Sequence, residues 1–589
     1  MRVQLAQQAQ EILGQRDLVS ITERVDDVAL LIGQMVTMGF VEVLDRHLPR
    51  HWKPRRLSGG WTAVIWLAYI LTEGEHRKVT VAASIQGMHH TLSHLSSQRI
   101  EPLDFSDDRL GRLLTHVSKA KYGHAIEQDW NACSIEVYAL HQDVIRCDAT
   151  SVSGGHDVTD GGLVQFGHSK DDPTRPQIKV MMGGLDPLGM PLATDVLSGE
   201  RADDGLYIPV IKRIEAGLPP GRRLLVGDGK MSAVATRAYV AGRQHWSLAP
   251  LPLTGGTAEA MPQGINAGIA QDREGVLTPL MRVNPGGTAV LVAEGSELER
   301  PCDLAARGAH WSERVLVVRS PAHAAQQAVG LEKRLAHAEQ KLAALTPARG
   351  RGQRQLPDEA TLVAAIARVL KEQRVEGLLS VTWERQGEQQ TSYVGRGRGS
   401  AKRAQRVREP IRDQSTRMVR EDDNIADCTA RFGWKALVTN ATPQRLSLAD
   451  AVLCYRNEYR LERLCNRLKS RVHIAPLFVT RDDQIEGLTY LLTLGVRVFT
   501  VREFVLRRSL QHEQAHLPGL HPENGKKMTN TPTAERLLKA FSAVSLTIIQ
   551  TAAGEEIRRW LTPLSALQQA ILSRLGLATS LSRQLAMQH

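Results

Sequence analysis

Three carboxylate residues occupy positions from which they could act together on divalent metal ions. Asp148 and Asp228 each end a short apolar run, and such runs predict buried strands, so both aspartates are expected at strand ends. Glu462 lies in a third segment, Tyr455 to Arg471, which reads YRNEYRLERLCNRLKSR and is expected to be one helix. Carboxylates that hold two Mg²⁺ or Mn²⁺ ions activate a water or hydroxyl for phosphoryl transfer. The catalytic and metal-binding set predicted from the sequence is therefore Asp148, Asp228 and Glu462.

The charge balance indicates a polyanionic substrate. The chain has 589 residues, with 74 Lys and Arg against 63 Asp and Glu, a net charge of +11. A basic excess attracts polyanions. Aromatic residues make up only 4%, which disfavours a single-strand binder built on base stacking and favours contacts to duplex phosphates. Double-stranded DNA is the expected partner.

Cysteine use and hydropathy indicate the compartment. The six cysteines form no C-x-x-C pair, so neither a zinc ribbon nor a disulfide framework is indicated, and reduced thiols are expected. The N-terminal segment lacks the apolar core of a signal peptide. The longest apolar stretch, 61–72, is too short to span a bilayer. These features predict a cytoplasmic protein that does not enter the membrane.

The elements that must position the two aspartates follow a recognisable order. Strands are predicted at 143–147, 177–185, 191–197, 223–226 and 245–251, with helices at 206–216 and 232–242. The order β-β-β-α-β-α-β is that of a ribonuclease-H-like α/β fold with a mixed sheet. In that order the first and fourth strands are neighbours, so Asp148 and Asp228 are expected side by side.

Composition shifts divide the chain into five regions. We expect a helical N-terminal domain (1–140), the first part of the core (141–254), a β-rich and helical insertion (255–440), the second part of the core (441–510) and a helical C-terminal region (511–589). The N-terminal helices could bind DNA ends, although packing helices alone would give the same pattern. In the insertion, 324–345 and 359–373 predict a helical hairpin, with stripes that favour intramolecular packing over a partner-binding zipper.

A basic arm within the insertion, Arg396 to Arg412, is interpreted as a phosphate-contacting segment, with a solvated loop as the alternative. Its DNA-binding candidates are Arg396, Arg398, Lys402 and Arg403.

The Tyr455–Arg471 segment, drawn as one helix, carries three stripes. One is apolar, Leu461, Leu464 and Leu468. One is basic, Arg456, Arg460, Arg463, Arg467 and Arg471. The third combines Tyr455, Glu458, Glu462 and Lys469. Five arginines on one face favour a lined anion channel, against the simpler reading of a solvated basic helix. Tyr455, Lys469 and the arginines Arg456, Arg460, Arg463 and Arg467 are therefore candidate DNA contacts.

These residues resemble a known signature. Tyr455, Glu462 and Lys469 match the Y-x2-R-x3-E-x6-K pattern of one branch of the DDE transposases of bacterial insertion sequences, while Glu458 occupies the arginine position. Asp228-Gly229, Asp148-Ala149-Thr150 and the segment from Phe166 to Asp171 also resemble that family. The resemblance covers the chain from about Ile21 onward.

The resemblance implies a DNA transposase of a mobile element. It would cut DNA at the terminal inverted repeats, with Mg²⁺ or Mn²⁺, and transfer the 3′-OH into target DNA. It would act as a homodimer on DNA, in the bacterial cytoplasm close to the nucleoid. Two alternatives stay open: another ribonuclease-H-like metal-dependent nuclease, and an inactive DNA-binding protein derived from a transposase. No ATP-binding motif is present. His156 and His168, on the loop after the first strand, are more simply solvated than catalytic.

Overall fold

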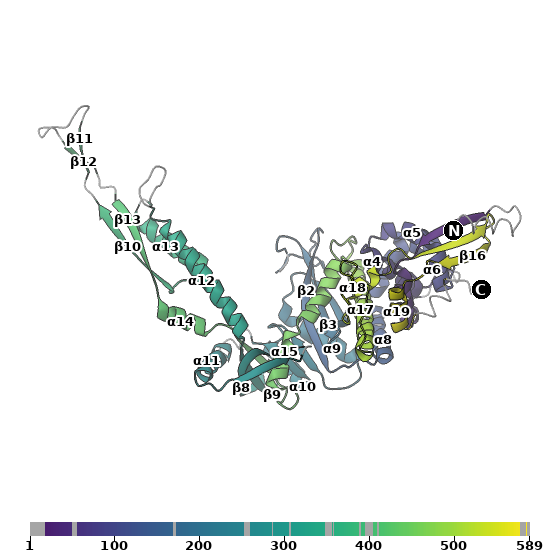
Figure 1. The fold of residues 1–589 in the computed structure, drawn as a ribbon, viewed down its shortest axis with the longest axis horizontal. Coiled ribbons are helices and arrows are strands. Elements are labelled where there is room, and N and C mark those ends of the chain that lie inside the picture. Colours follow the sequence, from purple (N-terminus) through teal and green to yellow (C-terminus); the bar gives the residue numbers. More distant parts are fainter. Residues whose placement is uncertain are drawn as a thin grey trace. The chain divides into compact units, whose positions relative to one another are not determined.

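The computed structural model has a mixed α/β architecture with a large mixed sheet and many helices (Figure 1). It describes residues 18–49, 56–168, 172–251, 260–284, 287–304, 308–347, 356, 358–387, 390–394, 405–408, 412–577 and 585. The chain forms two compact units. Unit 1 consists of Met1–Ala249, Asp303–Trp311 and Cys454–His589, and unit 2 consists of Pro250–Cys302 and Ser312–Leu453. Asp148, Asp228 and Glu462 all belong to unit 1.

The sheet of unit 1 explains how two of the acids meet. Its strands are β2 (Val144–Ser153), β3 (Gln177–Leu185), β4 (Met190–Ser198), β5 (Leu224–Gly227) and β6 (Trp246–Pro250), in the order β4-β3-β2-β5-β6. β2, β5 and β6 run parallel, whereas β3 and β4 run antiparallel to their neighbours. Helices α9 (Tyr207–Gly217) and α10 (Val234–Gly242) precede and follow β5. The predicted order of elements and the pairing of the first and fourth strands are confirmed.

Strand β2 is longer than the sequence predicted. Its parallel pairing with β5 ends at Cys147↔Gly227, but its antiparallel pairing with β3 continues to Ser153↔Gln177. The expectation that Asp148 ends its strand is therefore wrong: Asp148 lies within β2, at the level where β5 stops. The apolar run ends at Cys147, and the small polar residues after it gave no strand signal, although β3 holds them in register.

The N-terminal region is helical, as predicted, apart from one strand. Its helices are α2 (Val28–Thr37), α3 (Phe40–His47), α4 (Gly59–Glu73), α5 (Lys78–Gln86), α6 (His89–Ser96), α7 (Asp107–Ser118), α8 (Ala120–Tyr138) and the short 3₁₀ helix η1 (Pro102–Phe105). Strand β1 (Leu18–Arg24) was not predicted. Among the described residues no single helix is long and apolar enough to cross a membrane; α2 and α3 pass that test only as a pair bent by 65°.

The prediction of a wholly helical C-terminal region is wrong. After α17 (Asp482–His512) and α18 (Ala534–Lys539) come strands β15 (Ser545–Thr551) and β16 (Glu556–Leu561), then helix α19 (Ala566–Arg574). β15 pairs with both β1 and β16, so the two ends of unit 1 share one three-stranded sheet. The β-branched residues of β15 explain the strand. Helix α19 begins with a capping box made by Ser565 and Gln568.

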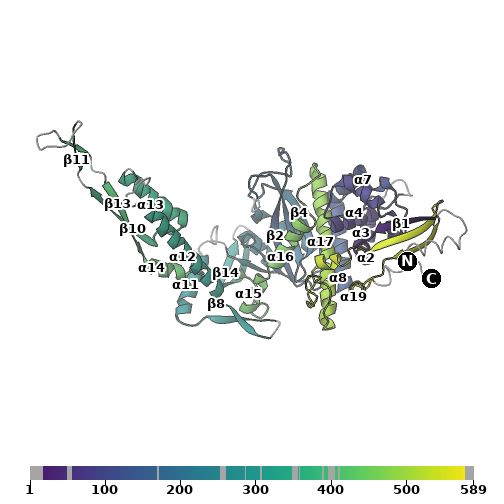
Figure 2. The same ribbon diagram turned by 45° about the horizontal axis from the view of Figure 1, so that its top comes forward.

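One hydrophobic core joins these parts of unit 1. Residues of the N-terminal helices, the sheet and the C-terminal elements belong to the same buried cluster. Helix α17 lies between β4 on one side and α7 on the other (Figure 2). Its middle, from Gly487 to Glu503, is buried continuously. Residues 18–140 thus pack onto the same core as the sheet instead of forming a separate compact unit.

Unit 2 is β-rich and helical. Strands β7 (Thr278–Val283), β8 (Ala289–Leu304), β9 (Ala309–Arg319) and β14 (Trp434–Thr439) follow the order β14-β9-β8-β7, accompanied by α11 (Ala260–Arg273). Helices α12 (Pro321–Ala343) and α13 (Glu359–Gln373) pack their apolar stripes together, which confirms the predicted helical hairpin and its intramolecular role. The remaining elements are β10 (Leu379–Gly387), β11 (Gln390–Tyr393), β12 (Gln405–Arg408), β13 (Arg412–Arg420) and α14 (Asp422–Ala430).

The basic arm is only partly described. Arg396, Arg398, Lys402 and Arg403 lie outside the described residues. The stretch 405–408 is strand β12, paired with β11, so this part of the arm is a strand and not the solvated loop that was its alternative.

The contact between α17 and α7 can be tested at Gly487. A Cβ added there would lie 2.1 Å from the backbone oxygen of Leu114, which cannot swing away as a side chain would. We expect Gly487→Ala to lower the free energy of unfolding by about 2 kcal/mol, because overpacking forces backbone shifts. Urea unfolding would measure it.

The matched control is Gly242→Ala, at the end of α10, where an added Cβ meets no described atom within 4 Å. That variant should be neutral or up to about 1 kcal/mol more stable. Equal stability of the two variants would contradict the close α17–α7 approach.

Candidate active site

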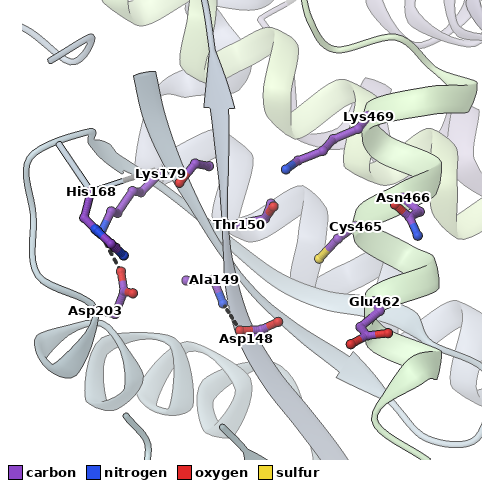
Figure 3. A pocket seen from close by; sticks show the side chains of 11 residues that line it. Asp148, Ala149, Thr150, His168, Lys179, Asp203, Glu462, Cys465, Asn466 and Lys469 are labelled. Carbon is purple, nitrogen blue, oxygen red and sulfur yellow. Dashed lines mark hydrogen bonds and ion pairs between the residues drawn. The ribbon is translucent and has the colours of Figure 1, made fainter. Parts of the chain in front are cut away.

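A cavity of about 290 Å³ lies beside β2. Asp148 and Thr150 of β2 line it, and so do Glu462, Cys465, Asn466 and Lys469 from the helical segment opposite (Figure 3). His168, Lys179 and Asp203 lie on the other side of the strand, with Ala149 and Ser151 completing the lining. The structure therefore brings Asp148, Glu462 and Lys469, three residues predicted from the sequence, around one cavity.

Asp228 follows β5 directly, one residue beyond the Cys147↔Gly227 pair, just as Asp148 follows Cys147 in β2. Its Oδ1 accepts a hydrogen bond from the Tyr207 hydroxyl at 2.6 Å and another from the Lys230 backbone N–H at 2.9 Å. Burial, followed by the nearby charges of Asp228 and Asp148, raises the pKa of Tyr207 well above its ordinary value. Tyr207 therefore keeps its proton and orients Asp228.

Tyr207 was missed by sequence reasoning. Its position at the start of a predicted helix carries no chemical signal, and only the fold shows that α9 brings its hydroxyl to the end of β5.

The segment that carries Glu462 is not one helix. Helix α15 (Leu448–Arg456) ends before a turn at Asn457 and Glu458; helix α16 (Tyr459–Asn466) follows, and a π-helical turn, η4 (Arg467–Arg471), completes the segment. The prediction of an unbroken helix is wrong. The buried guanidinium of Arg146 donates to the backbone oxygen of Cys454 at 2.7 Å, which satisfies one of the last carbonyls of α15 where that helix stops.

A fourth carboxylate, that of Glu458, lies near enough to Glu462 and Asp228 to be affected by their charges. Burial raises the pKa of Glu458, the nearby charges of Glu462 and Asp228 raise it further, and a hydrogen bond with Tyr455 opposes the rise. Burial also raises the pKa of Tyr455, followed by the effects of Glu458, Asp228 and Asp148. Tyr455 and Glu458 thus sit at the edge of the acidic group, although the turn separates Tyr455 from the helix of Glu462.

Three arginines of the stripe are paired with carboxylates of unit 1. Arg460 binds both carboxylate oxygens of Asp186, at 3.1 and 2.9 Å. Arg463 binds both oxygens of Glu503, each at 2.8 Å, and the buried Arg467 pairs with Glu503 and Glu535. Carboxylates of unit 1 thus occupy the guanidinium groups of Arg460, Arg463 and Arg467, which gives these residues a structural role, and their contact with DNA stays a prediction.

Other predicted contacts remain accessible. Arg456, at the end of α15, is exposed, and Lys469 faces the cavity (Figure 3). Arg471 donates to the backbone oxygen of Leu71 and lies over the ring of Phe499, so it packs inward.

The donor chemistry at this edge of the sheet suits Mg²⁺, which prefers carboxylate oxygens. Asp148 and Glu462 both reach the cavity, while Asp228 beside them is turned toward Tyr207. Among the described residues, no three His, Cys, Asp or Glu side chains are gathered closely enough to hold a metal ion. The residue types fit the ion, and the present side-chain positions do not form a closed ligand shell.

Comparison with known proteins gives no family. Neither a protein-family model nor a curated protein sequence matches the chain. Among solved structures, the cryo-EM structure of the piggyBac transposase synaptic complex with hairpin DNA is similar at a TM-score of 0.36 and 8% sequence identity, over 96% of this chain and 86% of that chain. A score this low supports no assignment of function to this chain.

The arginine pairs with Glu503 predict a large loss of stability on substitution. Glu503 is buried and is contacted by Arg463, Arg467 and Arg507. Glu503→Gln should lower the free energy of unfolding by about 3 kcal/mol, because it leaves the buried Arg467 without its main counter-charge. Glu513→Gln, which breaks a surface pair with Arg574, is the control and should leave urea unfolding unchanged. A loss below about 1 kcal/mol for Glu503→Gln would show that these arginines need no internal partner.

The raised pKa of Glu458 predicts a pH dependence of stability. Its ionised form is disfavoured in the folded chain, so its contribution to stability is present at low pH and is lost as the pH rises through the folded pKa. The melting temperature of Glu458→Gln, relative to the wild type, should therefore increase between about pH 4 and pH 8.

Glu75→Gln provides a control of opposite sign. A hydrogen bond from Arg77 lowers the pKa of Glu75, so this glutamate stabilises the folded chain more as the pH rises. The same trend in both variants would contradict the burial of Glu458 among acids.

Proposed function

We propose that this chain is a DDE-type transposase of a bacterial insertion sequence, which cuts DNA at the element's ends and joins the freed 3′-OH to target DNA. One observation carries the proposal: Asp148 and Asp228 lie at the same level of two adjacent parallel strands, and Glu462 faces Asp148 across one cavity. The strand order β4-β3-β2-β5-β6 is the one expected of a ribonuclease-H-like core. The Y-x2-R-x3-E-x6-K spacing, met except at Glu458, supports the same family.

Asp148, Asp228 and Glu462 would hold two Mg²⁺ or Mn²⁺ ions. When bound, such ions lower the pKa of an attacking water and stabilise the departing 3′ oxygen. Asp148 and Glu462 approach from opposite sides of the cavity, and the Tyr207 hydroxyl fixes one oxygen of Asp228. Lys469 faces the same space, where its ammonium acts as a point charge for a backbone phosphate.

In each step, an incoming oxygen forms a bond to phosphorus and the 3′ oxygen of a DNA strand leaves. In the first, water adds and the 3′ oxygen leaves. In the second, the oxygen of that 3′-OH forms a bond to a target phosphorus, the target strand's own 3′ oxygen leaves as a 3′-OH, and the element strand is joined to the target's 5′ phosphate. No covalent bond between protein and DNA is required, so the site needs no nucleophilic side chain. Arg456 and Tyr455 are proposed to contact the DNA beside the cavity, in a homodimer assembled on the element's two ends.

Charge-neutral substitutions test the three acids. We expect Asp148→Asn, Asp228→Asn and Glu462→Gln each to reduce strand cleavage by at least about 10³-fold, since loss of a metal ligand removes several kcal/mol of transition-state stabilisation. The substrate is a duplex that carries the DNA flanking the gene, with Mg²⁺, and strand ends are mapped on gels. Binding of the duplex should change little.

Asp160→Asn is the matched control, because Asp160 is an exposed acid on the loop after β2. It should cut normally. Cleavage above a few per cent of the wild type in any of the three variants would remove that residue from the set. Cleavage without strand joining would favour a nuclease of the same fold, and binding without cleavage would favour an inactive, transposase-derived DNA-binding protein.

A further inference from the structure

Lys179 is a charged residue in an otherwise uncharged, buried strand. Strand β3 reads QIKVMMGGL, every residue of it is buried, and Lys179 is its only charged residue. The lysine side chain is 6% exposed and forms an ion pair with Asp203 of the short 3₁₀ helix η2 (Asp203–Gly205). Both residues line the cavity that holds Asp148 and Glu462 (Figure 3).

Stability alone does not explain this pair. Burying an ammonium group requires loss of its hydration, and a buried ion pair is often no more stable than apolar residues of similar size. An apolar residue at position 179 would suit the rest of β3. The pair instead forms part of a cavity wall, where the Lys179 ammonium group can attract an anion that enters the cavity.

The cavity wraps around the edge of β2 that β5 leaves uncovered. Lys179 pairs in register with Ser151, so these two side chains share one face of the sheet. Asp148 and Thr150 alternate with Ser151 along β2 and face Glu462 and Lys469 instead. His168 joins Lys179 on its side, placed by the Gln177 side-chain amide, which donates to the His168 backbone oxygen at 3.1 Å. One side of the strand therefore presents Asp148, Glu462 and Lys469, and the other presents Lys179 with its partner Asp203.

We propose that Lys179 binds a backbone phosphate of the DNA strand lying in the cavity, next to the phosphate that is cut. This inference rests on the proposed function and adds a contact outside the sequence signature. Asp203 positions the ammonium group and competes with the phosphate for it. A strand that crosses the edge of β2 would then be held by Lys179 on one side and by Lys469 on the other.

The test is the salt dependence of binding. A fluorescently labelled duplex carrying the DNA flanking the gene is titrated without divalent metal at several salt concentrations. Each neutralised phosphate contributes about 0.9 to the slope of log K against log salt. Lys179→Gln should flatten the slope by about that amount and weaken binding at low salt by roughly fivefold, while Lys179→Arg should keep the slope. Lys526→Gln, at an exposed lysine of unit 1, should match the wild type.

Asp203→Asn separates a phosphate contact from a structural ion pair. It removes the same ion pair but keeps the ammonium group, so the slope should stay unchanged and binding should be equal or tighter. If Lys179→Gln and Asp203→Asn instead lower the melting temperature alike and neither alters the slope, Lys179 is structural and the inference fails. If Lys179→Gln does not fold, the double variant Lys179→Gln/Asp203→Asn replaces it, because it has no unpaired buried charge. The same flattening of the salt slope is expected for the double variant.

The two proposals fail in different ways. A wild-type chain that binds and cuts the duplex, with an unchanged slope in Lys179→Gln, overturns this inference alone. A wild-type chain that neither binds nor cuts it overturns the proposed function and this inference with it.

Discussion

The candidate site depends on two neighbouring strands that end at different levels. β5 stops at Gly227, while β2 continues to Ser153 along β3. Parallel pairing fixes the register, so Asp148 and Asp228 come level just where β5 ends. The longer strand leaves an uncovered edge, and the cavity occupies it.

Two internal acid–base clusters hold the segment with Glu462 over this edge. Arg146 of β2 and Arg460 of α16 both bind Asp186, which ties the helix to the sheet. Arg463 and Arg467 bind Glu503 of α17, which ties the same segment to the central helix. Because these pairs are wholly or partly buried, breaking one partner is costly even where the intact pair adds little stability. Much of the local arginine content therefore positions the segment that carries Glu462.

Sequence patterns predicted the strand order and the pairing of β2 with β5, because these rest on local apolar runs and on short turns. They also brought Asp148, Glu462 and Lys469 into one group. They failed where tertiary contacts decide the outcome. Residues 149–153 are a strand because β3 pairs with them. Glu458 lies in a turn that follows α15, where Arg146 donates a hydrogen bond to the Cys454 carbonyl of that helix.

The arginine stripe shows the same limit. A helical wheel records which side chains share a face, but it does not record what packs against that face. Asp186 and Glu503, distant in sequence, form ion pairs with Arg460 and Arg463, which the sequence had placed along an anion channel. Tyr207 and Lys179 were missed for the same reason: the sequence does not show their neighbours, and only the fold places each of them beside an acid.

The surroundings of position 458 explain why a glutamate is tolerated there. The signature has an arginine there, and here a buried arginine already approaches from the sheet: Arg146, whose charge opposes the rise in the pKa of Glu458. Arg146 also binds Asp186 and the Cys454 carbonyl, so one guanidinium organises the turn and faces the extra acid. An arginine at 458 would bring a second positive charge next to Arg146. Glu458 instead partly offsets that charge, while the nearby Glu462 and Asp228 disfavour its ionised form.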